Sequence, residues 1–432
     1  MSAAALSPVP HLTTALQGPL RQIETTLLER QDKIEAWFRQ QWVDVPPPFY
    51  ASVDLRNAGY KLAPVDTNLF PAGFNNLNPD FHALGVQAMQ IALERVCPKA
   101  RKILLVPEKH TRNRFYLENV ATLRDLIEQA GFQVRVGTVS PEIESQQEEE
   151  LPSGRKLLLE AVQRDGDNIV LADGFTPCAV ILNNDLSGGV PAALDGIEQQ
   201  IVPPLSLGWS HRLKSDHFQV YSDVVREFAE LVDIDPWLID PMFRNCGEIN
   251  FKTREGEDCL ARNVAALLLD VKAKYDEYGI TERPYCVVKA DAGTYGMGIM
   301  TVSSPEEVQN LNRKQRKGMA SSKEGAEVSQ VIIQEGVPTL EELDGKTAEP
   351  VVYMVDRFVI GGFYRVHGSK GAQENLNSPG ASFERLAFAD SCNTPHHELE
   401  PDAEPNRFYA YGVIARLALI AAAREIQNSK AL

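Results

Sequence analysis

The spacing of apolar residues predicts helices alternating with short buried strands along this chain. Leucine, isoleucine and tryptophan recur three or four positions apart over 16–42, which predicts an amphipathic helix. An apolar run at 101–107, a helical pattern over 113–130 and a second apolar run at 132–139 predict a strand, a helix and a strand. A β-α-β unit of this kind is typical of a small parallel sheet, so we expect the α/β fold class.

Composition narrows the class of protein. The chain has 432 residues, too many for one ordinary core, with 44% hydrophobic and 24% charged residues, as in soluble globular enzymes. A net charge of −16 argues against nucleic acid or an anionic membrane as partner. Six cysteines without C-x-x-C pairs favour reduced thiols over a disulfide or zinc framework. With no secretory signal and no apolar run of transmembrane length, we expect a cytoplasmic protein.

The segment 285–302, YCVVKADAGTYGMGIMTV, places a lysine between an apolar strand and a glycine-rich turn. Lys289 ends the strand, and Gly293, Gly296 and Gly298 precede a second apolar run. A lysine ammonium is a compact charge for phosphate oxygens, and glycines let backbone N–H groups approach an anion. The segment therefore predicts a polyphosphate site, with a plain β-hairpin as the alternative.

Three well-known phosphate-binding motifs do not fit the chain. A P-loop needs G-x-x-x-x-G-K-[ST], but Leu340 stands where the first glycine should precede Gly345-Lys346-Thr347. The glycines of 293–298 have the order G-x-x-G-x-G and lead into an apparent strand, whereas a dinucleotide fingerprint has the order G-x-G-x-x-G before a helix. Neither H-R-D nor D-F-G follows, which argues against a protein kinase.

The order of the following segments resembles that of ATP-grasp enzymes. A buried strand over 329–337 ends in Gln-Glu-Gly-Val and resembles the hinge that binds adenine and ribose. This resemblance implies that Glu335 and Val337 contact the nucleotide. Two further predicted strands carry Arg357 and Arg365, which we expect to neutralise charge during catalysis.

The segment 374–380, ENLNSPG, is the predicted metal site. ATP-grasp ligases place a carboxylate and an amide oxygen before a Pro-Gly turn, where both bind magnesium. Glu374 has the expected distance from the proline, but Leu376 holds the amide position between two asparagines. Either asparagine could be the ligand, or the segment could be a substrate loop with the metal elsewhere. The candidate Mg²⁺ ligands are Asp356, Glu374, Asn375 and Asn377.

A basic segment precedes these elements. The run GWSHRLKSDHF at 208–218 lies before a predicted helix. ATP-grasp enzymes carry an additional nucleotide-contacting lysine upstream of the glycine loop, which by resemblance implies Lys214, with Arg212 as second choice. A basic helix entrance without a ligand is the alternative.

The segment 51–77 concentrates charges and amides among prolines, glycines and aromatics. Burying so many polar groups would be costly unless a ligand or the backbone satisfied them. It predicts a pocket for a small zwitterion, with arginine or lysine for a carboxylate and aspartate for an ammonium; a structured surface loop is the alternative. The candidate substrate-binding residues are Asp54, Arg56, Lys61, Asp66, Asn68 and Asn75.

Long runs across the chain resemble the proteobacterial glutamate–cysteine ligases. They are DLRNAGYKLAPVDTNLFPAGFNNL, KADAGTYGMGIM and ENLNSPGASFERLAF. The resemblance implies an ATP-grasp-like ligase that uses ATP and Mg²⁺ to join L-glutamate to L-cysteine, the first step of glutathione biosynthesis. We expect an N-terminal helix at 1–45, an α/β substrate lobe with a parallel sheet at 46–205, and a nucleotide-binding and catalytic region at 206–432. Another ATP-grasp peptide ligase, such as a glutathione synthetase, and a non-catalytic nucleotide-binding protein are the alternatives.

Overall fold

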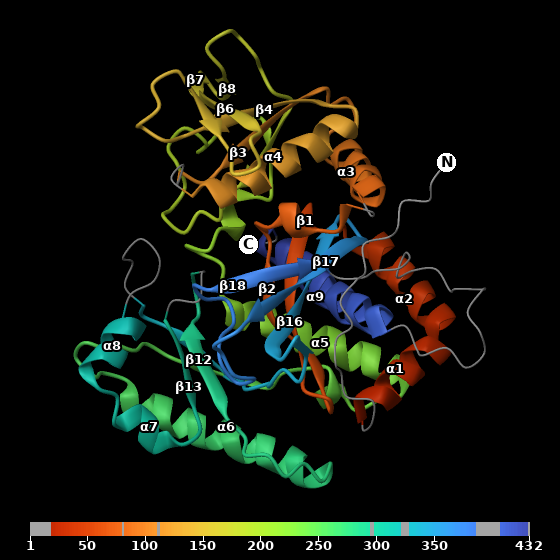
Figure 1. The fold of residues 1–432 in the computed structure, drawn as a ribbon, viewed down its shortest axis with the longest axis vertical. Helices are drawn as coiled ribbons and strands as arrows, with labels where there is room; N and C mark the ends of the chain where they lie inside the picture. Colours follow the sequence, from red (N-terminus) through yellow and green to blue (C-terminus); the bar gives the residue numbers. More distant parts are fainter. Residues whose placement is uncertain are drawn as a thin grey trace.

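The computed structural model describes residues 19–79, 82–109, 113–293, 298–320, 328–385 and 407–430. Figure 1 shows three main sheets with helices packed against them, so the expected α/β class is confirmed. One sheet lies in an upper lobe, one in the centre and one in a lower lobe of this view.

The N-terminal region contains two helices where the apolar spacing predicted one. They are α1 (Pro19–Glu29) and α2 (Gln31–Asp44), and Arg30 between them has φ −106° and ψ 14°, outside the helical range. Ile34 and Phe38 of α2 are buried, and the carboxylate of Glu35 pairs with Arg416 of the C-terminal helix α9 (Arg407–Lys430). Helices α2 and α9, which lie far apart in the sequence, are thus packed together.

The central sheet combines strands from both ends of the chain. Its order is β18-β17-β16-β1-β2, with β15 (Glu342–Leu343) beside β16. Strand β1 lies between β2 and β16, and all these pairs are antiparallel. The pairing of β1 with β16 crosses the boundary expected between 46–205 and 206–432, because strand pairing is not limited to neighbours in sequence. The main strands are β1 (Tyr50–Asn57), β2 (Leu62–Asn68), β16 (Lys346–Val355), β17 (Phe358–His367) and β18 (Ala381–Arg385).

The upper lobe contains the predicted β-α-β unit. Strands β3 (Lys102–Pro107) and β4 (Gln133–Thr138) are parallel and are joined through α4 (Arg114–Gln129). The sheet order is β10-β9-β3-β4-β6-β5, and only β5 runs antiparallel to its neighbour. The remaining elements are α3 (His82–Val96), β5 (Gln146–Glu150), β6 (Lys156–Ala161), β7 (Gln163–Asp165), β8 (Asn168–Val170), β9 (Ala179–Asn183) and β10 (Gln200–Val202).

The lower lobe contains the predicted glycine-turn hairpin. Strands β12 (Cys286–Ala290) and β13 (Ile299–Val302) are antiparallel, with Lys289 opposite Ile299. The sheet order is β11-β14-β12-β13, where β11 is Phe243–Cys246 and β14 is Val331–Glu335. The helices of this lobe are α6 (Glu257–Glu277), α7 (Pro305–Gln309) and α8 (Arg313–Met319).

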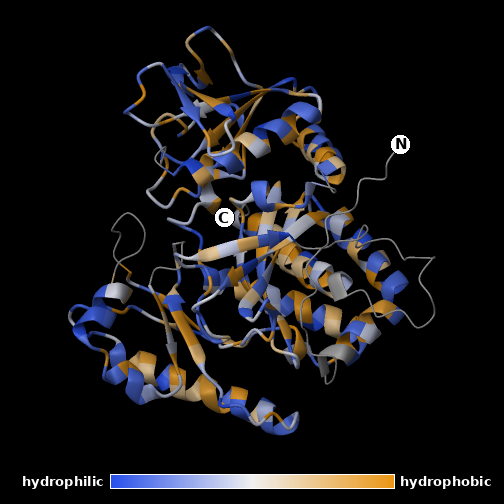
Figure 2. Ribbon diagram, in the orientation of Figure 1, coloured by the Kyte–Doolittle hydropathy of each residue, from blue (hydrophilic) through white to orange (hydrophobic). Residues whose placement is uncertain are grey.

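Hydrophobic residues follow the strands and the inward faces of the helices, while hydrophilic residues cover the outside (Figure 2). Helix α9 is buried along 409–423 and packs against α5 (Lys214–Val232) and the central sheet. Within the described ranges, none of the helices is long and apolar enough to cross a membrane.

Candidate active site

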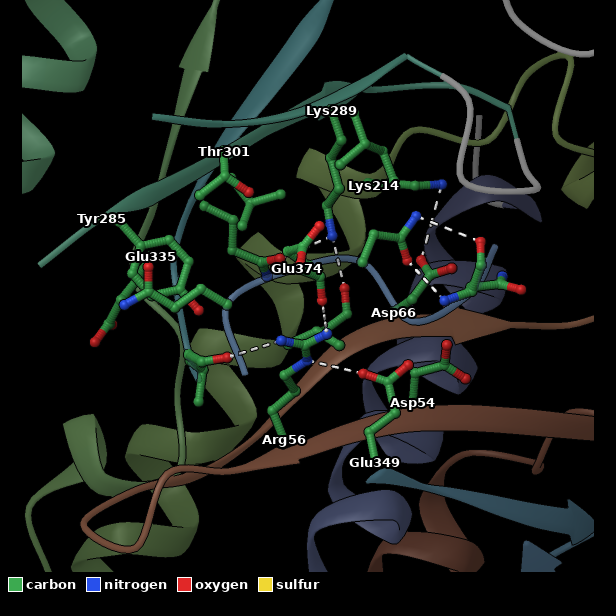
Figure 3. A pocket seen from close by; sticks show the side chains of 18 of the residues that line it. Asp54, Arg56, Asp66, Lys214, Tyr285, Lys289, Thr301, Glu335, Glu349 and Glu374 are labelled. Atoms are coloured by element: carbon green, nitrogen blue, oxygen red, sulfur yellow. Dashed lines mark hydrogen bonds and ion pairs between the residues drawn. The ribbon is translucent and has the colours of Figure 1, made fainter. Parts of the chain in front are cut away.

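A cleft with about 870 Å³ of empty space, a volume that includes open solvent, lies between the central sheet and the lower-lobe sheet. Figure 3 shows its side chains converging from β1, β2, β12, α5 and the segment after β17. Most of the residues predicted from the sequence line it, although they come from opposite ends of the chain. Those are Asp54, Arg56, Asp66, Lys214, Lys289, Gly293, Glu335, Val337, Arg365, Glu374, Asn375 and Asn377.

Lys289 is held in the cavity by two acceptors. Its Nζ donates to the backbone carbonyl of Val65, at 2.6 Å, and to Oε1 of Gln334, at 2.8 Å. The side chain is buried, and this burial lowers the pKa of Lys289 to about 8, although the nearby Asp66 carboxylate opposes the shift. Because burial disfavours the charged form of an ammonium, an anionic ligand would stabilise Lys289 more than these two neutral acceptors do.

Lys214 enters the cavity from the first residue of α5. Its Nζ donates to the carbonyl of Gly293 at 2.8 Å and lies 3.5 Å from the centre of the Trp209 ring. The carboxylate of Asp291 accepts hydrogen bonds from the backbone N–H and the hydroxyl of Ser215, at 2.8 and 2.7 Å. These contacts tie the N-terminus of α5 to the glycine turn, where Gly293 has φ 99°, a conformation that favours glycine.

Two aspartates face each other beneath the lysines. Asp54 of β1 lies directly opposite Asp66 of β2. Burial would raise the pKa of Asp66, but the charges of Lys214 and Lys289 outweigh it, so the pKa is lowered. Asp66 Oδ1 lies 3.8 Å from Lys214 Nζ and has no hydrogen-bond partner in the described part of the chain. Burial raises the pKa of Asp54, and its bond to Arg365 only partly opposes the shift.

Arg365 and Glu349 extend this polar row across the sheet. Arg365 Nη1 donates to Asp54 Oδ2 at 2.7 Å and to Glu349 Oε1 at 2.6 Å. Burial would lower the pKa of Arg365, but these two carboxylates outweigh it and raise the pKa. Its buried Nε has no acceptor among the residues described, so the guanidinium retains a donor for a ligand. The sequence analysis missed Glu349, although a lone acid within the apolar strand β16 is a signal that could have revealed it.

Arg56 has a structural role that differs from the predicted carboxylate binding. Its Nε donates to Glu349 Oε2 at 2.8 Å, and its two terminal nitrogens donate to the carbonyls of Ala372 and Glu374, at 2.8 and 2.7 Å. The guanidinium therefore holds the segment after β17 against β1 (Figure 3). Arg56 also lines the cavity, so its predicted contact with the substrate stays a prediction beside this structural role.

Lys61 and Glu335 form a buried ion pair that supports the hinge. Lys61 Nζ donates to Glu335 Oε2 at 2.6 Å and lies 4.3 Å from the Trp237 ring centre. The same carboxylate accepts from Trp237 Nε1 at 3.2 Å and from the Met242 N–H at 3.0 Å. Lys61 is fully buried and is not among the residues that line the cavity. The side chain of Glu335 is thus bound to protein donors, but Glu335 also lines the cavity, so its predicted contact with the nucleotide stays a prediction.

An apolar wall lies beside the hinge. It contains Tyr285, Val287, Ile299 and Val337, together with Thr301, and the sequence analysis did not single out most of these residues. A Cβ added at Gly336 would lie 2.2 Å from the Tyr285 ring, so glycine is required for the ring to pack here. The wall can accommodate a planar apolar group.

The predicted metal ligands are not brought together. Asp356 lies in the turn between β16 and β17, where its Oδ2 accepts from Arg95 Nε at 2.7 Å. Neither Asp356 nor its neighbour Arg357 lines the cavity, so we correct their predicted metal-binding and catalytic roles. Glu374 lines the cavity, but its carboxylate accepts from Lys370 and the Gly371 N–H, both at 2.9 Å.

The two asparagines of this segment also line the cavity, and Asn375 Oδ1 accepts from the Asn377 N–H at 2.9 Å. Across the ranges that the structure describes, no group of three or more His, Cys, Asp or Glu side chains is arranged to hold a metal ion.

The remaining predicted residues that the structure describes lie outside the lining of this cavity. Asn68 Oδ1 accepts from the Phe70 N–H at 2.9 Å and shapes the turn after β2. Asn75 lines a second cavity between α3, α4 and β17. A Cβ on Gly298, which has φ 64°, would lie 3.5 Å from that of Ala290, and Gly296 lies outside the described residues.

The chain is similar to a known protein family over most of its length. The family model described as GshA, glutamate-cysteine ligase, matches residues 24–426. A crystal structure from Methylobacillus flagellatus KT, provisionally assigned as a γ-glutamylcysteine synthetase, shares 57% identity and a TM-score of 0.90, covering 98% of this chain and 99% of that one. No curated protein matches the chain.

Two more distant structures are a glutathione synthetase-like effector from Globodera pallida and a D-alanyl-alanine synthetase A from Vibrio cholerae. Each has 11% identity, with TM-scores of 0.37 and 0.34. The first match covers 85% of this chain and 80% of that one, and the second covers 74% and 81%. These scores are too low to bear on the fold. The long family match and the 57% identical relative, by contrast, cover nearly the whole chain. The chain therefore belongs to the glutamate–cysteine ligase family.

Proposed function

We propose that the cavity binds ATP, L-glutamate and L-cysteine, and that ligation of the two amino acids takes place there in an ATP-grasp-like arrangement. The observation that carries this proposal is the convergence of Lys214 and Lys289, from separate elements, on a single cavity beside two aspartates. Two buried ammonium groups at one point favour a polyanion, which matches the ATP that the family uses.

The two ends of the cavity suggest the orientation of the nucleotide. The apolar wall around Tyr285 and Val337 suits the adenine ring. The phosphates would then lie at the lysines, with the N-terminus of α5 adding its positive dipole. Exchange of the carbonyls of Val65 and Gly293 for phosphate oxygens would keep both ammonium groups bonded.

Asp66 would hold Mg²⁺ in this arrangement. Carboxylate oxygens are the protein ligands that Mg²⁺ prefers, and it commonly binds through one or two carboxylates plus phosphates. The partnerless Oδ1 of Asp66 fits such a role, because a buried carboxylate oxygen without a donor is costly. The ion, when bound, would neutralise phosphate charge.

The reaction requires an activated carboxylate, because carboxylate oxygen is a poor leaving group. An oxygen of the glutamate γ-carboxylate attacks the γ-phosphorus, the bond to the β-phosphate oxygen breaks, and ADP leaves an acyl phosphate. The cysteine ammonium gives up one proton, and its nitrogen then forms a bond to the acyl carbon. The carbon–oxygen bond to phosphate breaks, and the departing phosphate takes the second proton from the nitrogen.

The cavity residues would act by orientation and charge. The free Nε donor of Arg365 would bind the oxygen that becomes negative at the acyl centre. Asp54, whose pKa is raised by burial, would accept the proton of the cysteine ammonium at its Oδ1 while Oδ2 stays bonded to Arg365.

Product identification tests the proposal. The purified chain is incubated with ATP, Mg²⁺, glutamate and cysteine, and γ-glutamylcysteine and phosphate are measured together. We expect both products in equal amounts. Glutathione formed from γ-glutamylcysteine and glycine instead would indicate a glutathione synthetase, and ATP binding without phosphate release with any amino acid would indicate a non-catalytic protein.

A further inference from the structure

A buried charge cluster joins the C-terminal helix to the cavity. The Glu425 carboxylate of α9 accepts two hydrogen bonds from Arg212, from Nε at 2.7 Å and from Nη2 at 3.0 Å. It also contacts His217 Nδ1 at 3.2 Å. The side chains of Arg212 and His217 are each 2% exposed and that of Glu425 is 12% exposed, so the cluster is shielded from solvent.

The other ends of both side chains reach Thr67. Arg212 Nη1 donates to the Thr67 carbonyl at 2.7 Å, and His217 Nε2 lies 2.9 Å from the Thr67 hydroxyl. Thr67 directly follows Asp66 on β2, and Arg212 lies two residues before Lys214. The cluster therefore links α9, β2 and the start of α5 at the point where Asp66 and Lys214 enter the cavity.

Hydrogen-bonding chemistry defines the protonation states of His217 and Glu425 in this cluster. A carboxylate only accepts, so His217 Nδ1 carries the proton and Nε2 accepts from the Thr67 hydroxyl. Burial lowers the pKa of His217, which agrees with a neutral ring, although Glu425 opposes the shift. Burial would raise the pKa of Glu425, but Arg212 and His217 outweigh it and hold the pKa at about 2. Arg212, the second choice for the nucleotide-contacting cation, is thus bonded to Glu425.

We propose that Glu425 is a positioning residue for the ATP and Mg²⁺ site, acting through Arg212, His217 and Thr67 on Asp66 and Lys214. The proposal rests on the proposed function of the cavity. Groups behind metal and phosphate ligands set the orientation of those ligands, and their loss weakens affinity without a direct contact to the ligand. An element near the end of the chain would thereby control a site built mainly from residues far before it.

The chain offers a matched control on the same helix. Arg416 of α9 pairs with Glu35 at 2.7 Å, and these side chains are 3% and 16% exposed, similar to Arg212 and Glu425. Glu35 lies on α2, away from the residues that line the cavity. Glu35→Gln and Glu425→Gln therefore each remove one charge from a comparable buried pair, but only the second acts on β2 and α5.

The experiment measures binding of a non-hydrolysable ATP analogue with Mg²⁺ by calorimetry, and unfolding of each variant by urea. We expect Glu425→Gln to weaken analogue binding by about 10- to 100-fold, as the loss of groups that orient metal ligands does. Glu35→Gln should lose similar stability but keep wild-type affinity. Glu425→Asp, which keeps the charge, should recover part of the loss.

Thr67→Val keeps the proposal testable if Glu425→Gln does not fold. It removes only the hydroxyl bonded to His217 and should weaken analogue binding by about two- to tenfold. Unchanged affinity in the folded variants, or equal losses in Glu35→Gln and Glu425→Gln, would overturn the proposal. If the wild type binds the analogue but forms no γ-glutamylcysteine, the proposed function is wrong. The positioning role is then still decided by the analogue affinities of the Glu425, Glu35 and Thr67 variants.

Discussion

Replacement of Lys289 tests the phosphate end of the cavity. Lys289→Met removes the ammonium but keeps an unbranched side chain in its buried position. A charge-assisted hydrogen bond contributes about 1.5–3 kcal/mol, so ATP affinity should fall by about 10- to 150-fold. The carbonyl of Val65 and the side-chain oxygen of Gln334 lose their donor in this variant. Lys289→Arg keeps the charge and serves as the matched control.

The pH dependence separates loss of the charge from loss of the fold. Burial lowers the pKa of Lys289 from 10.5 to about 8, so the free protein loses this charge as the pH rises through about 8. Phosphate binding needs the protonated form, and the wild-type affinity should fall by roughly tenfold from about pH 7 to about pH 9. Between about pH 8 and pH 10.5 the unfolded chain holds more protons than the folded chain, so the contribution of Lys289 to stability rises with pH in that range.

Calorimetric titration of a non-hydrolysable ATP analogue with Mg²⁺, at several pH values, measures this effect. Lys289→Arg should lose the part of the pH dependence that belongs to Lys289, because a guanidinium stays charged throughout, and any remaining slope is assigned to Lys214. Urea unfolding at the same pH values provides the stability. A wild-type affinity that stays flat from about pH 7 to about pH 9, together with unchanged binding by Lys289→Met, would refute the role of Lys289.

The other substitutions test separate parts of the site. Asp66→Asn should raise the Mg²⁺ concentration needed for half-maximal analogue binding by at least about tenfold, and an unchanged requirement would place the metal elsewhere. Arg56→Ala should free the segment bonded through Ala372 and Glu374, seen as faster proteolysis or hydrogen exchange there; intact protection would contradict the anchoring role. Lys61→Met removes the cation from the buried Glu335 carboxylate and should lower the free energy of unfolding in urea by about 3–5 kcal/mol. A much smaller decrease would show that the hydrogen bonds from Trp237 and Met242 are enough to stabilise the carboxylate. Gly336→Ala places a methyl group 2.2 Å from the Tyr285 ring, so both stability and analogue affinity should fall, and a wild-type affinity would exclude the ring from the base site.

Elements that depend on neighbouring residues could be predicted from the sequence. The two paired strands that flank the glycine segment follow from short β-forming runs on either side of it, and the β-α-β unit follows from its periodicity. In both cases the determining interactions lie within one or two elements. The length of the family-like runs likewise allowed the ligase family to be predicted, and the family match confirms it.

Contacts between distant segments were decided by the tertiary structure. Arg56 was predicted to bind substrate because its charge was visible, but its acceptors lie about 300 residues away in the chain, at Glu349, Ala372 and Glu374. Asp356 was assigned to the metal as a second carboxylate beside Glu374, yet the turn directs it to Arg95. The sequence shows which side chains are charged, but the packing of whole helices and strands decides which group each charge pairs with. The position of β1 between β2 and β16 therefore determines which charges face the cavity and which stabilise its walls.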